Sequence, residues 1–337
     1  MRIGLTYDLR QDYLDLGFDE EETAEFDRIE TVESIEKTLG LLGHQTERIG
    51  NIWNLTKMLA EEKRWDLVFN IAEGLYGIGR ESQVPALLDA YQIPYTFSDP
   101  LVLALTLHKG MAKSVLRDKG IPTPLFTEIH SVDDINGTAL QYPMFAKPLA
   151  EGTGKGIDGR SKINNKTELS DVCIRLLQAY KQPVLLESYL PGREFTVGLV
   201  GTGNKARSVG VIEVILKDQA EQHAYSYINK EKCEELVEYR PVSDILAKKA
   251  EETALAAWRA LGCRDAGRVD LRNDVHDIPN VMEINPLAGI HPEHSDLPII
   301  CTFYGIRYVS LLEMILESAM ERVNVNKPGL FSPVENA

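Results

Sequence analysis

The chain has 337 residues, 44% of them hydrophobic and 26% charged, which is the composition of a globular protein and not of a disordered one. This length exceeds what a single small core supports, so we expect two or three α/β domains. The formal net charge of −15 argues against a general nucleic-acid binder and against a membrane-surface binder.

The cysteines and the N-terminus both indicate a cytoplasmic protein. Cys173, Cys233, Cys263 and Cys301 are scattered and form no Cys-x-x-Cys pair, so we expect four reduced thiols and no disulfide framework. The sequence runs from Met1 directly into strand-like residues without a signal-peptide pattern. It contains no run of 18 apolar residues.

The first hundred residues alternate between strand and helix patterns. Arg2–Tyr7 reads as a buried strand, and the charged residues 8–27 read as a long loop or lid. Apolar residues recur at helical spacing in Thr31–Leu42, and a further helix around Ile52–Lys63 leads to a strand over Asp66–Asn70. This alternation predicts a doubly wound parallel sheet.

A glycine-containing loop over Glu73–Glu81 follows that second strand. Loops at the carboxyl ends of parallel strands are where such sheets bind ligands, although its three glycines could equally serve simple turns. Helices are then expected over Val84–Tyr91 and Lys109–Lys119, the latter ending at Gly120 and the prolines that follow.

A second glycine-rich segment follows the strand Tyr142–Lys147. Residues Glu151–Gly156 could form a hairpin loop whose backbone N–H groups close over phosphates. The Gly-x-x-x-x-Gly-Lys-Ser/Thr pattern of a P-loop is absent. A glycine-rich surface hairpin without a ligand is the alternative.

The middle of the chain reads as antiparallel strands and one helix. Val184–Leu190 is a strand that runs into a connector, and Arg193–Val200 pairs naturally with Ser208–Leu216. Leu246–Leu261 forms an amphipathic helix, and we expect its Trp258 to fill the core.

Two short apolar stretches near the end, Gly267–Arg272 and Val281–Pro286, carry oxygen-bearing side chains at alternate positions. Residues two apart on a strand face the same side, so Glu283 and Asn285 point together while Met282 and Ile284 turn to the core. A hairpin would bring Asp270 beside them and create a plausible Mg²⁺ site, since Mg²⁺ prefers oxygen ligands. The alternative is a strand with solvated charges on its outer face.

Five segments together resemble the D-alanine–D-alanine ligases, which belong to the ATP-grasp superfamily. They are Glu73-Gly74 to Glu81, Lys147-Pro148 through Gly156, Glu187-Ser188-Tyr189-Leu190 with Gly192-Arg193-Glu194, Arg268-Val269-Asp270, and Glu283-Ile284-Asn285-Pro286. The match covers most of the chain, from Phe69 to about Pro298. The resemblance implies an α/β (α+β) ATP-grasp fold with a Rossmann-like N-terminal domain (1–100), a central small subdomain (101–186) and a C-terminal subdomain with the metal site (187–337).

The resemblance also implies site roles. Lys109 and Lys147 would contact ATP, residues Glu151, Gly152, Thr153 and Gly154 would lie in the loop over the triphosphate, Glu187, Ser188, Tyr189 and Leu190 would read adenine, and Glu194 would bind the ribose. Lys230 would reach the γ-phosphate, and Asp270, Glu283 and Asn285 would hold two Mg²⁺ ions, with Mn²⁺ as an alternative. Arg268 and the backbone N–H of Gly289 would stabilise the oxyanion.

The activity implied by the resemblance is an ATP-dependent ligation of a carboxylate and an amine through an acyl phosphate, with release of ADP and phosphate. The substrates would be small amino acids, and family precedent implies a homodimer. A ligase of the same mechanism for another amino acid or small peptide, a nucleotide-binding homologue without turnover, and a phosphotransferase acting on a small alcohol are the rival hypotheses.

The amino-acid side departs from that family. Its opening Gly-Gly-x-Ser-x-Glu loop, whose glutamate holds the first amino group, has no match in the acidic N-terminal segment; Arg10, Glu25 and Asp27 there are either substrate contacts or a solvated face. The Asn-Thr-Ser-Pro-Gly-Met segment of the family is replaced by residues 285–290. Glu73, His291, His294 and Ser295 are candidate substrate residues. The two histidines could instead bind zinc, or lie in a loop without any chemical role.

Overall fold

The computed structural model describes residues 1–221, 223 and 226–325, without the side chains of residues 231, 324 and 325; part of the expected third domain, 326–337, lies outside the described residues. The helices are Arg10–Asp15 (α1), Ile29–Leu41 (α2), Ile52–Ala60 (α3), Gln83–Ala90 (α4), Pro100–Leu107 (α5), Lys109–Asp118 (α6), Lys166–Tyr180 (α7), Tyr227–Glu231 (α8), Cys233–Leu236 (α9), Ile245–Leu261 (α10), Asp296–Phe303 (α11) and Tyr308–Val325 (α12). The strands are Arg2–Thr6 (β1), Gln45–Gly50 (β2), Leu67–Asn70 (β3), Phe126–Ile129 (β4), Met144–Pro148 (β5), Lys162–Ile163 (β6), Val184–Ser188 (β7), Glu194–Val200 (β8), Arg207–Leu216 (β9), Val237–Pro241 (β10), Ala266–Asn273 (β11) and Pro279–Asn285 (β12).

The first sheet has the order β2-β1-β3 with parallel pairing. Side chains alternate between its faces: Leu67 and Phe69 pack with α2, whereas Val68 packs with α3 and α4. Helices therefore cover both faces, which confirms the doubly wound α/β arrangement. Segment 8–27 contains the short helix α1, so it is not the continuous loop that the sequence indicated.

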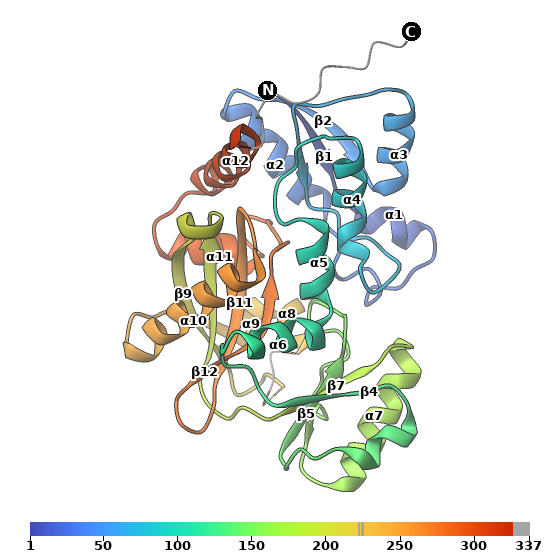
Figure 1. Cartoon of the computed structure of the whole chain (residues 1–337), viewed down its shortest axis with the longest axis vertical. Coiled ribbons are helices and arrows are strands. Elements are labelled where there is room, and N and C mark those ends of the chain that lie inside the picture. Colours follow the sequence, from blue (N-terminus) through green and yellow to red (C-terminus); the bar gives the residue numbers. More distant parts are fainter. Residues whose placement is uncertain (222, 224–225, 326–337) are drawn as a thin grey trace.

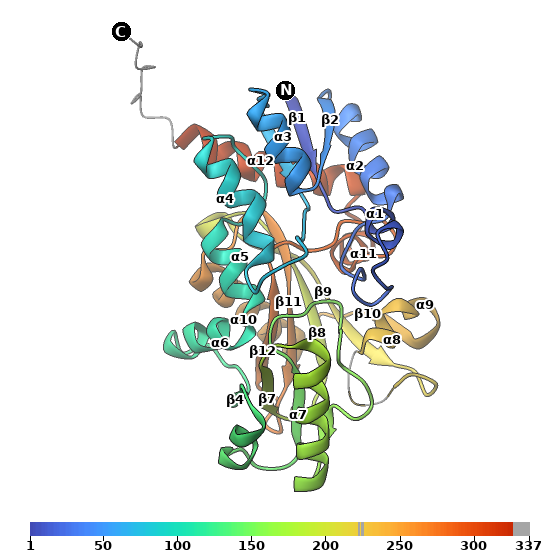
Figure 2. The ribbon, with the colours of Figure 1, turned by 90° about the vertical axis from the view of Figure 1, so that its right-hand side faces the viewer.

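The second sheet has the order β4-β7-β5-β6 and is antiparallel. One of its faces packs on α7, which lies along the sheet in Figures 1 and 2. The connection from β5 to β6 contains the glycine-rich residues 151–156, as expected for a loop between paired strands. Strand β7 continues to Ser188, two residues beyond the expected end of the central subdomain.

The third sheet has the order β10-β9-β8-β11-β12. Helix α10 packs on one face and contributes Trp258, which is fully buried as predicted. Helix α11 packs against β8 and β9, and its Leu297 and Ile300 belong to a different hydrophobic cluster from that of Trp258. The sheet thus sits between two helical layers, with the β11–β12 hairpin at its edge.

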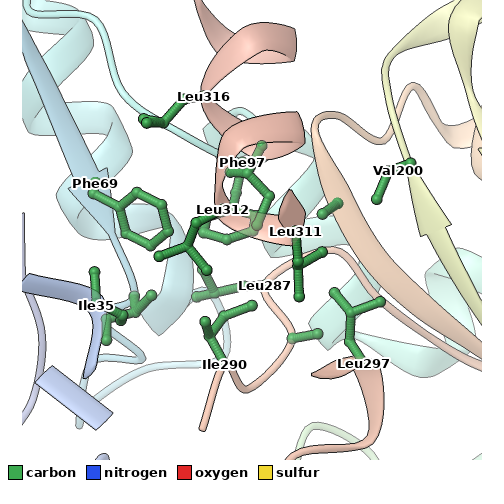
Figure 3. Packing of buried hydrophobic residues seen from close by; sticks show 14 of the residues in the cluster. Ile35, Phe69, Phe97, Val200, Leu287, Ile290, Leu297, Leu311, Leu312 and Leu316 are labelled. Atoms are coloured by element: carbon green, nitrogen blue, oxygen red, sulfur yellow. The ribbon is translucent and has the colours of Figure 1, made fainter. Parts of the chain in front are cut away.

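The largest hydrophobic cluster joins the first and third sheets. Figure 3 shows Leu312 and Leu316 of α12 on the side of Phe69 and Phe97 of the N-terminal part, and Leu311 of the same helix next to Leu297. Leu297 and Val200, from the C-terminal part, belong to the same cluster. The last helix therefore ties the N-terminal sheet to the sheet that carries β11 and β12.

No single helix of the described residues is long and apolar enough to cross a membrane; α11 and α12 meet that test only as a pair, bent by 115°. Both helices contribute buried residues to the largest cluster.

Candidate active site

Two adjoining cavities lie between the three sheets. The smaller has a volume of about 80 Å³ and the larger about 540 Å³. Glu283 and Lys230 line both, so the cavities meet at the edge of the third sheet. Every residue to which the sequence analysis gave a site role lines one or the other. Those of the smaller cavity are Lys109, Lys147, Glu151, Gly154, Glu187, Ser188, Tyr189, Leu190, Glu194, Lys230, Asp270 and Glu283. Those of the larger cavity are Glu73, Gly152, Thr153, Lys230, Arg268, Glu283, Asn285, Gly289, His291, His294 and Ser295.

The three oxygen-bearing side chains of the predicted metal site meet on the β11–β12 hairpin. Asp270 is the register partner of Glu283, and the Asn285 Nδ2 lies 3.3 Å from the Asp270 Oδ2. Close approach of the two strands requires Gly267, because a Cβ there would lie 2.4 Å from the carbonyl oxygen of Asn285. The alternative of solvated outward charges is excluded by this placement.

The predicted inward orientation holds for Ile284 but is wrong for Met282. Ile284 is buried, whereas Met282 lines the smaller cavity beside Glu283. The register shifts between Asp270 and Leu271, whose partners are Glu283 and Val281, so Met282 is the extra residue of a β-bulge. A bulge interrupts the strict alternation of side chains and redirects one of them.

Positive charges surround Glu283. The Lys109 Nζ lies 3.4 Å from its Oε1. Burial alone would raise the pKa of Glu283, but Lys109, Lys230 and Lys147 lower it to about 2. Glu283 is therefore a carboxylate at neutral pH. For the neighbouring Asp270, burial raises the pKa despite the nearby Arg268 charge.

Arg268 projects beside the predicted metal site, toward the larger cavity. Its Nη1 lies 3.5 Å from the Asp270 Oδ2 and 3.3 Å from the Asp296 Oδ2. Asp296, the first residue of α11, was not singled out from the sequence. Two carboxylates therefore orient this guanidinium at the boundary of the two cavities.

A buried charge cluster supports the wall of the smaller cavity. Glu187 forms ion pairs with Lys147 at 2.9 Å and with Lys113 at 2.7 Å. Burial would raise the pKa of Glu187, but these two lysines lower it. Burial lowers the pKa of Lys113 to about 8, and its Nζ also donates to the carbonyl oxygen of Val281 at 3.0 Å. Lys113 was missed because a lysine four residues into an amphipathic helix is normally solvated.

The connector after β7 carries the expected adenine-side residues. The N–H groups of Ser188 and Tyr189 donate to the carbonyl oxygens of Leu125 and Pro143 at 2.8 and 3.1 Å, so they fix the connector itself. Beside it, Arg272 lies 3.4 Å from Glu194 and 5.3 Å from the centre of the Tyr189 ring. Arg272 was also missed, although it is only two residues beyond Asp270.

The glycine-rich loop is attached to the N-terminal segment. Glu25 accepts from the N–H of Gly152 at 2.5 Å and pairs with Arg80 at 2.6 Å and Lys155 at 3.3 Å. Its side chain is only 7% exposed. The neighbouring Thr153 adopts φ of 51°, a left-handed conformation that is strained for a β-branched residue. The burial and the ion pairs of Glu25 show that it is not part of a solvated face.

We call this contact set, made by Glu25 with Arg80, Gly152 and Lys155, the Glu25 latch. Arg80 also donates to the carbonyl oxygen of Ala150 at 2.9 Å, and the Tyr180 hydroxyl donates to Glu21. The latch joins the N-terminal segment, which lines the larger cavity, to the loop that covers the smaller one.

Three further carboxyl groups, those of Asp27, Glu73 and Glu81, line the larger cavity. No basic group lies within 4 Å of them in the described part of the chain. Burial raises the pKa of Asp27 to about 7 and of Glu81 to about 8, and burial together with Glu81 raises that of Glu73. Gly74, with φ of 72°, lets the Glu73 loop turn closely past the carbonyl of Arg80.

The loop from residue 286 to 295 forms the opposite wall. The Ser295 Oγ accepts from the N–H of His291 at 3.0 Å, and a Cβ at Gly289 would lie 2.7 Å from the same oxygen. His294 pairs through its Nδ1 with Glu234 at 3.2 Å. Desolvation lowers the pKa of His291, which is therefore largely neutral at pH 7.

The chain is similar to known D-alanine–D-alanine ligases in sequence and in structure. Residues 115–317 match the family described as "D-ala D-ala ligase C-terminus". The D-alanine–D-alanine ligase of Marinomonas sp. (strain MWYL1) is 32% identical over 266 residues, which cover 78% of this chain and 80% of that protein.

Solved structures superpose over nearly the whole chain. The D-alanine–D-alanine ligase of Bacillus anthracis complexed with ATP gives a TM-score of 0.73 at 22% identity and covers 96% of this chain and 99% of that one. The VanG D-Ala:D-Ser ligase of Enterococcus faecalis gives 0.72 at 18% identity, with 94% and 99% covered. These comparisons confirm the resemblance, and the chain belongs to the D-alanine–D-alanine ligase family with its ATP-grasp fold.

Proposed function

We propose that the protein joins the carboxylate of one amino acid to an amine of another, using ATP to form an acyl phosphate. Its family membership makes it an ATP-dependent ligase that forms C–N bonds. The observation that carries the mechanism is the meeting of the two cavities at Glu283 and Lys230, next to Asp270. A nucleotide in one cavity and a carboxylate in the other would come together there.

The residues that line the smaller cavity have the chemistry of an ATP site. Phe145, Ile157, Leu190 and Met282 supply apolar surface for a base, and Glu194 lies at the edge where a ribose would sit. Lys109 and Lys147 extend toward the metal-site strands, where cations can neutralise a triphosphate.

Asp270, Glu283 and Asn285 fit Mg²⁺, because they offer three hard oxygen donors on adjacent strands and face the junction of the cavities. We propose that they hold two Mg²⁺ ions, which Mn²⁺ could replace. Bound there, the ions would neutralise charge on the transferring phosphoryl group.

The residues of the chain account for both chemical steps. In the first step an oxygen of the donor carboxylate bonds to the γ-phosphorus of ATP, the bond from that phosphorus to the β,γ-bridging oxygen breaks, and ADP leaves. Lys230 and Arg268 stabilise the negative charge that moves between the cavities. In the second step an amine attacks the acyl carbon, phosphate leaves and the amine loses a proton, which yields the amide.

Water must be excluded while the acyl phosphate exists. The glycine-rich loop covers the junction, and the Glu25 latch attaches it to the N-terminal segment. We propose that this contact links closure over the nucleotide to the presence of the amino-acid substrate, because both surfaces share one carboxylate.

The larger cavity favours a substrate other than D-alanine alone. Its volume of about 540 Å³ lies in the range of sites for ligands larger than alanine. Asp27, Glu73 and Glu81 supply carboxyl groups that can bind amino groups of the substrate. The N-terminal glutamate that binds the first amino group in the family has no counterpart in this sequence. The D-Ala:D-Ser ligase named above shows that this fold accepts different second substrates.

We further propose that the division at about residues 100 and 186 separates three domains, that the protein works in the cytoplasm, and that it forms a homodimer. Each of the three units contains one of the three sheets, apart from the last two residues of β7. Gel filtration with light scattering tests the dimer.

The test of the proposed function is a screen for ADP release. Purified protein with ATP and Mg²⁺ is offered pairs of D- and L-amino acids, diamino acids and dipeptides, and the products are weighed by mass spectrometry. We expect one ADP for each product whose mass equals the two substrates less one water. Silence across the screen, ADP without amide, or a phosphate ester as product would contradict the proposal.

A further inference from the structure

Three potential metal ligands from two distant segments meet at the wall of the larger cavity. Cys233 and Glu234 begin α9, and His294 lies 60 residues further along the chain than Glu234, in the loop before α11. One ligand atom from each of the three residues lies within 4.8 Å of the other two. The His294 Nδ1 and a Glu234 oxygen are already 3.2 Å apart.

The donor set differs from that of the β11–β12 hairpin. A thiolate, an imidazole nitrogen and a carboxylate are the ligands that zinc-type cations prefer, whereas Asp270, Glu283 and Asn285 offer only hard oxygens. With metal–ligand bonds of about 2.0–2.3 Å, tetrahedral ligand atoms lie ~3.5 Å apart, so this triangle needs to contract by about 1 Å.

Cys233 is distinguished from the other cysteines by its position. Cys173, Cys263 and Cys301 each lie within one of the large hydrophobic cores, whereas Cys233 belongs to a small cluster with Val214 and Val237 and lines the larger cavity. Cys233 packs with Val214 and Val237, and that packing does not require the neighbouring pair of His294 and Glu234. An exposed pair of this kind by itself stabilises little.

We propose that Cys233, Glu234 and His294 form a zinc-type divalent cation site, separate from the oxygen site of Asp270, Glu283 and Asn285. Three protein ligands leave the fourth tetrahedral position for water or a substrate group. Helix α8, which carries Lys230, directly precedes α9. A bound ion would therefore tie the segment that carries Lys230 to the loop of residues 286–295.

The test uses Co²⁺ as a spectroscopic probe. The full-length protein, with thiols reduced and Mg²⁺ in excess, is titrated with Co²⁺ and then with Zn²⁺. We expect a near-ultraviolet thiolate-to-cobalt charge-transfer band with one ion per chain, which Zn²⁺ abolishes by displacement. The Cys233→Ser variant should lose the band and weaken Zn²⁺ binding at least ~100-fold, while Cys173→Ser, the matched control, should keep both.

Two more variants keep the test decisive if Cys233→Ser folds poorly. His294→Gln and Glu234→Gln change partly and largely exposed side chains, respectively, and should each weaken Zn²⁺ binding about 10-fold or more. Asp270→Asn should leave the band unchanged. Absence of the band, its survival in Cys233→Ser, its loss in Cys173→Ser, or its loss in Asp270→Asn would each overturn the proposal.

Discussion

The two cavities differ in how their charges are matched. Around the smaller cavity each carboxylate has a basic partner: Glu187 lies between Lys113 and Lys147, and Glu194 faces Arg272. Around the larger cavity Asp27, Glu73 and Glu81 have no such partner among the described residues, and burial keeps their pKa values high. A preassembled charge network fits a fixed ligand such as a nucleotide, whereas unmatched carboxyl groups fit a ligand that brings its own positive charge.

The largest effect is expected from removing the charge of Asp270, next to the point where the two cavities meet. We expect Asp270→Asn to lower kcat for amide formation about 10³-fold or more, because the transferring phosphoryl group loses its ionic support. Steady-state ADP release measures the effect. Glu252→Gln, which changes an exposed carboxylate on α10, is the control and should retain full activity. Equal activity of both variants would contradict the assignment.

The second prediction concerns the Glu25 latch. We expect Glu25→Gln to lower kcat about 10²-fold and to raise the ratio of ADP to amide, since a misplaced loop admits water to the acyl phosphate. Glu20→Gln, which changes an exposed residue of the same segment, is the matched control. An unchanged ratio of ADP to amide would show that the latch is only structural.

The third prediction separates the two cavities. We expect Glu73→Gln to raise the KM of the amino-acid substrate about 10-fold, because one charge-assisted contact of about 1.4 kcal/mol is lost, and to leave the KM of ATP unchanged. Kinetics with each substrate varied in turn measure both constants. A parallel rise in the KM of ATP would mean that Glu73 serves the nucleotide side.

The smallest expected effect is a pH dependence of a few fold. Burial raises the pKa of Asp27 to about 7 and that of Glu81 to about 8, so both become anionic as the pH rises through that range. The affinity for a cationic substrate should rise from pH 6 to 8.5. The stability of the free protein should change in the opposite direction. It should fall as the pH rises from the pKa values of the unfolded chain, near 4, through those of the folded protein, because the folded state keeps these two protons to a higher pH.

Thermal unfolding of the free protein across pH 5–8.5 measures this fall in stability. Glu81→Gln should flatten the fall in Tm, because the residue can no longer titrate. A steeper fall of Tm with pH in the variant would contradict a raised pKa of Glu81 in the folded protein.

The β11–β12 hairpin could be predicted from the sequence because its residues lie in short segments of regular strands. The grouping of Asp270, Glu283 and Asn285 follows from side-chain alternation and the expected hairpin, and the structure places them on one hairpin. The single error there, Met282, comes from a β-bulge, which no alternation pattern reveals.

The amino-acid side could not be predicted in the same way because its contacts are long-range. Glu25 meets Gly152 across 127 residues, and Arg80 meets Glu25 across 55. In sequence Glu25 is one of several acidic residues in a charged stretch, and only tertiary packing distinguishes it from its solvated neighbours. Lys113, in the wall of the smaller cavity, was missed for the same reason, since its partner Glu187 lies on a strand far along the chain.

The fate of the carboxylate oxygen tests the central claim most directly. A donor amino acid found in the screen is labelled with ¹⁸O in its carboxylate and ligated with ATP, and the released phosphate is analysed by mass spectrometry. Formation of an acyl phosphate predicts one ¹⁸O atom in each phosphate and one fewer in the amide. Unlabelled phosphate beside a labelled amide would contradict the account.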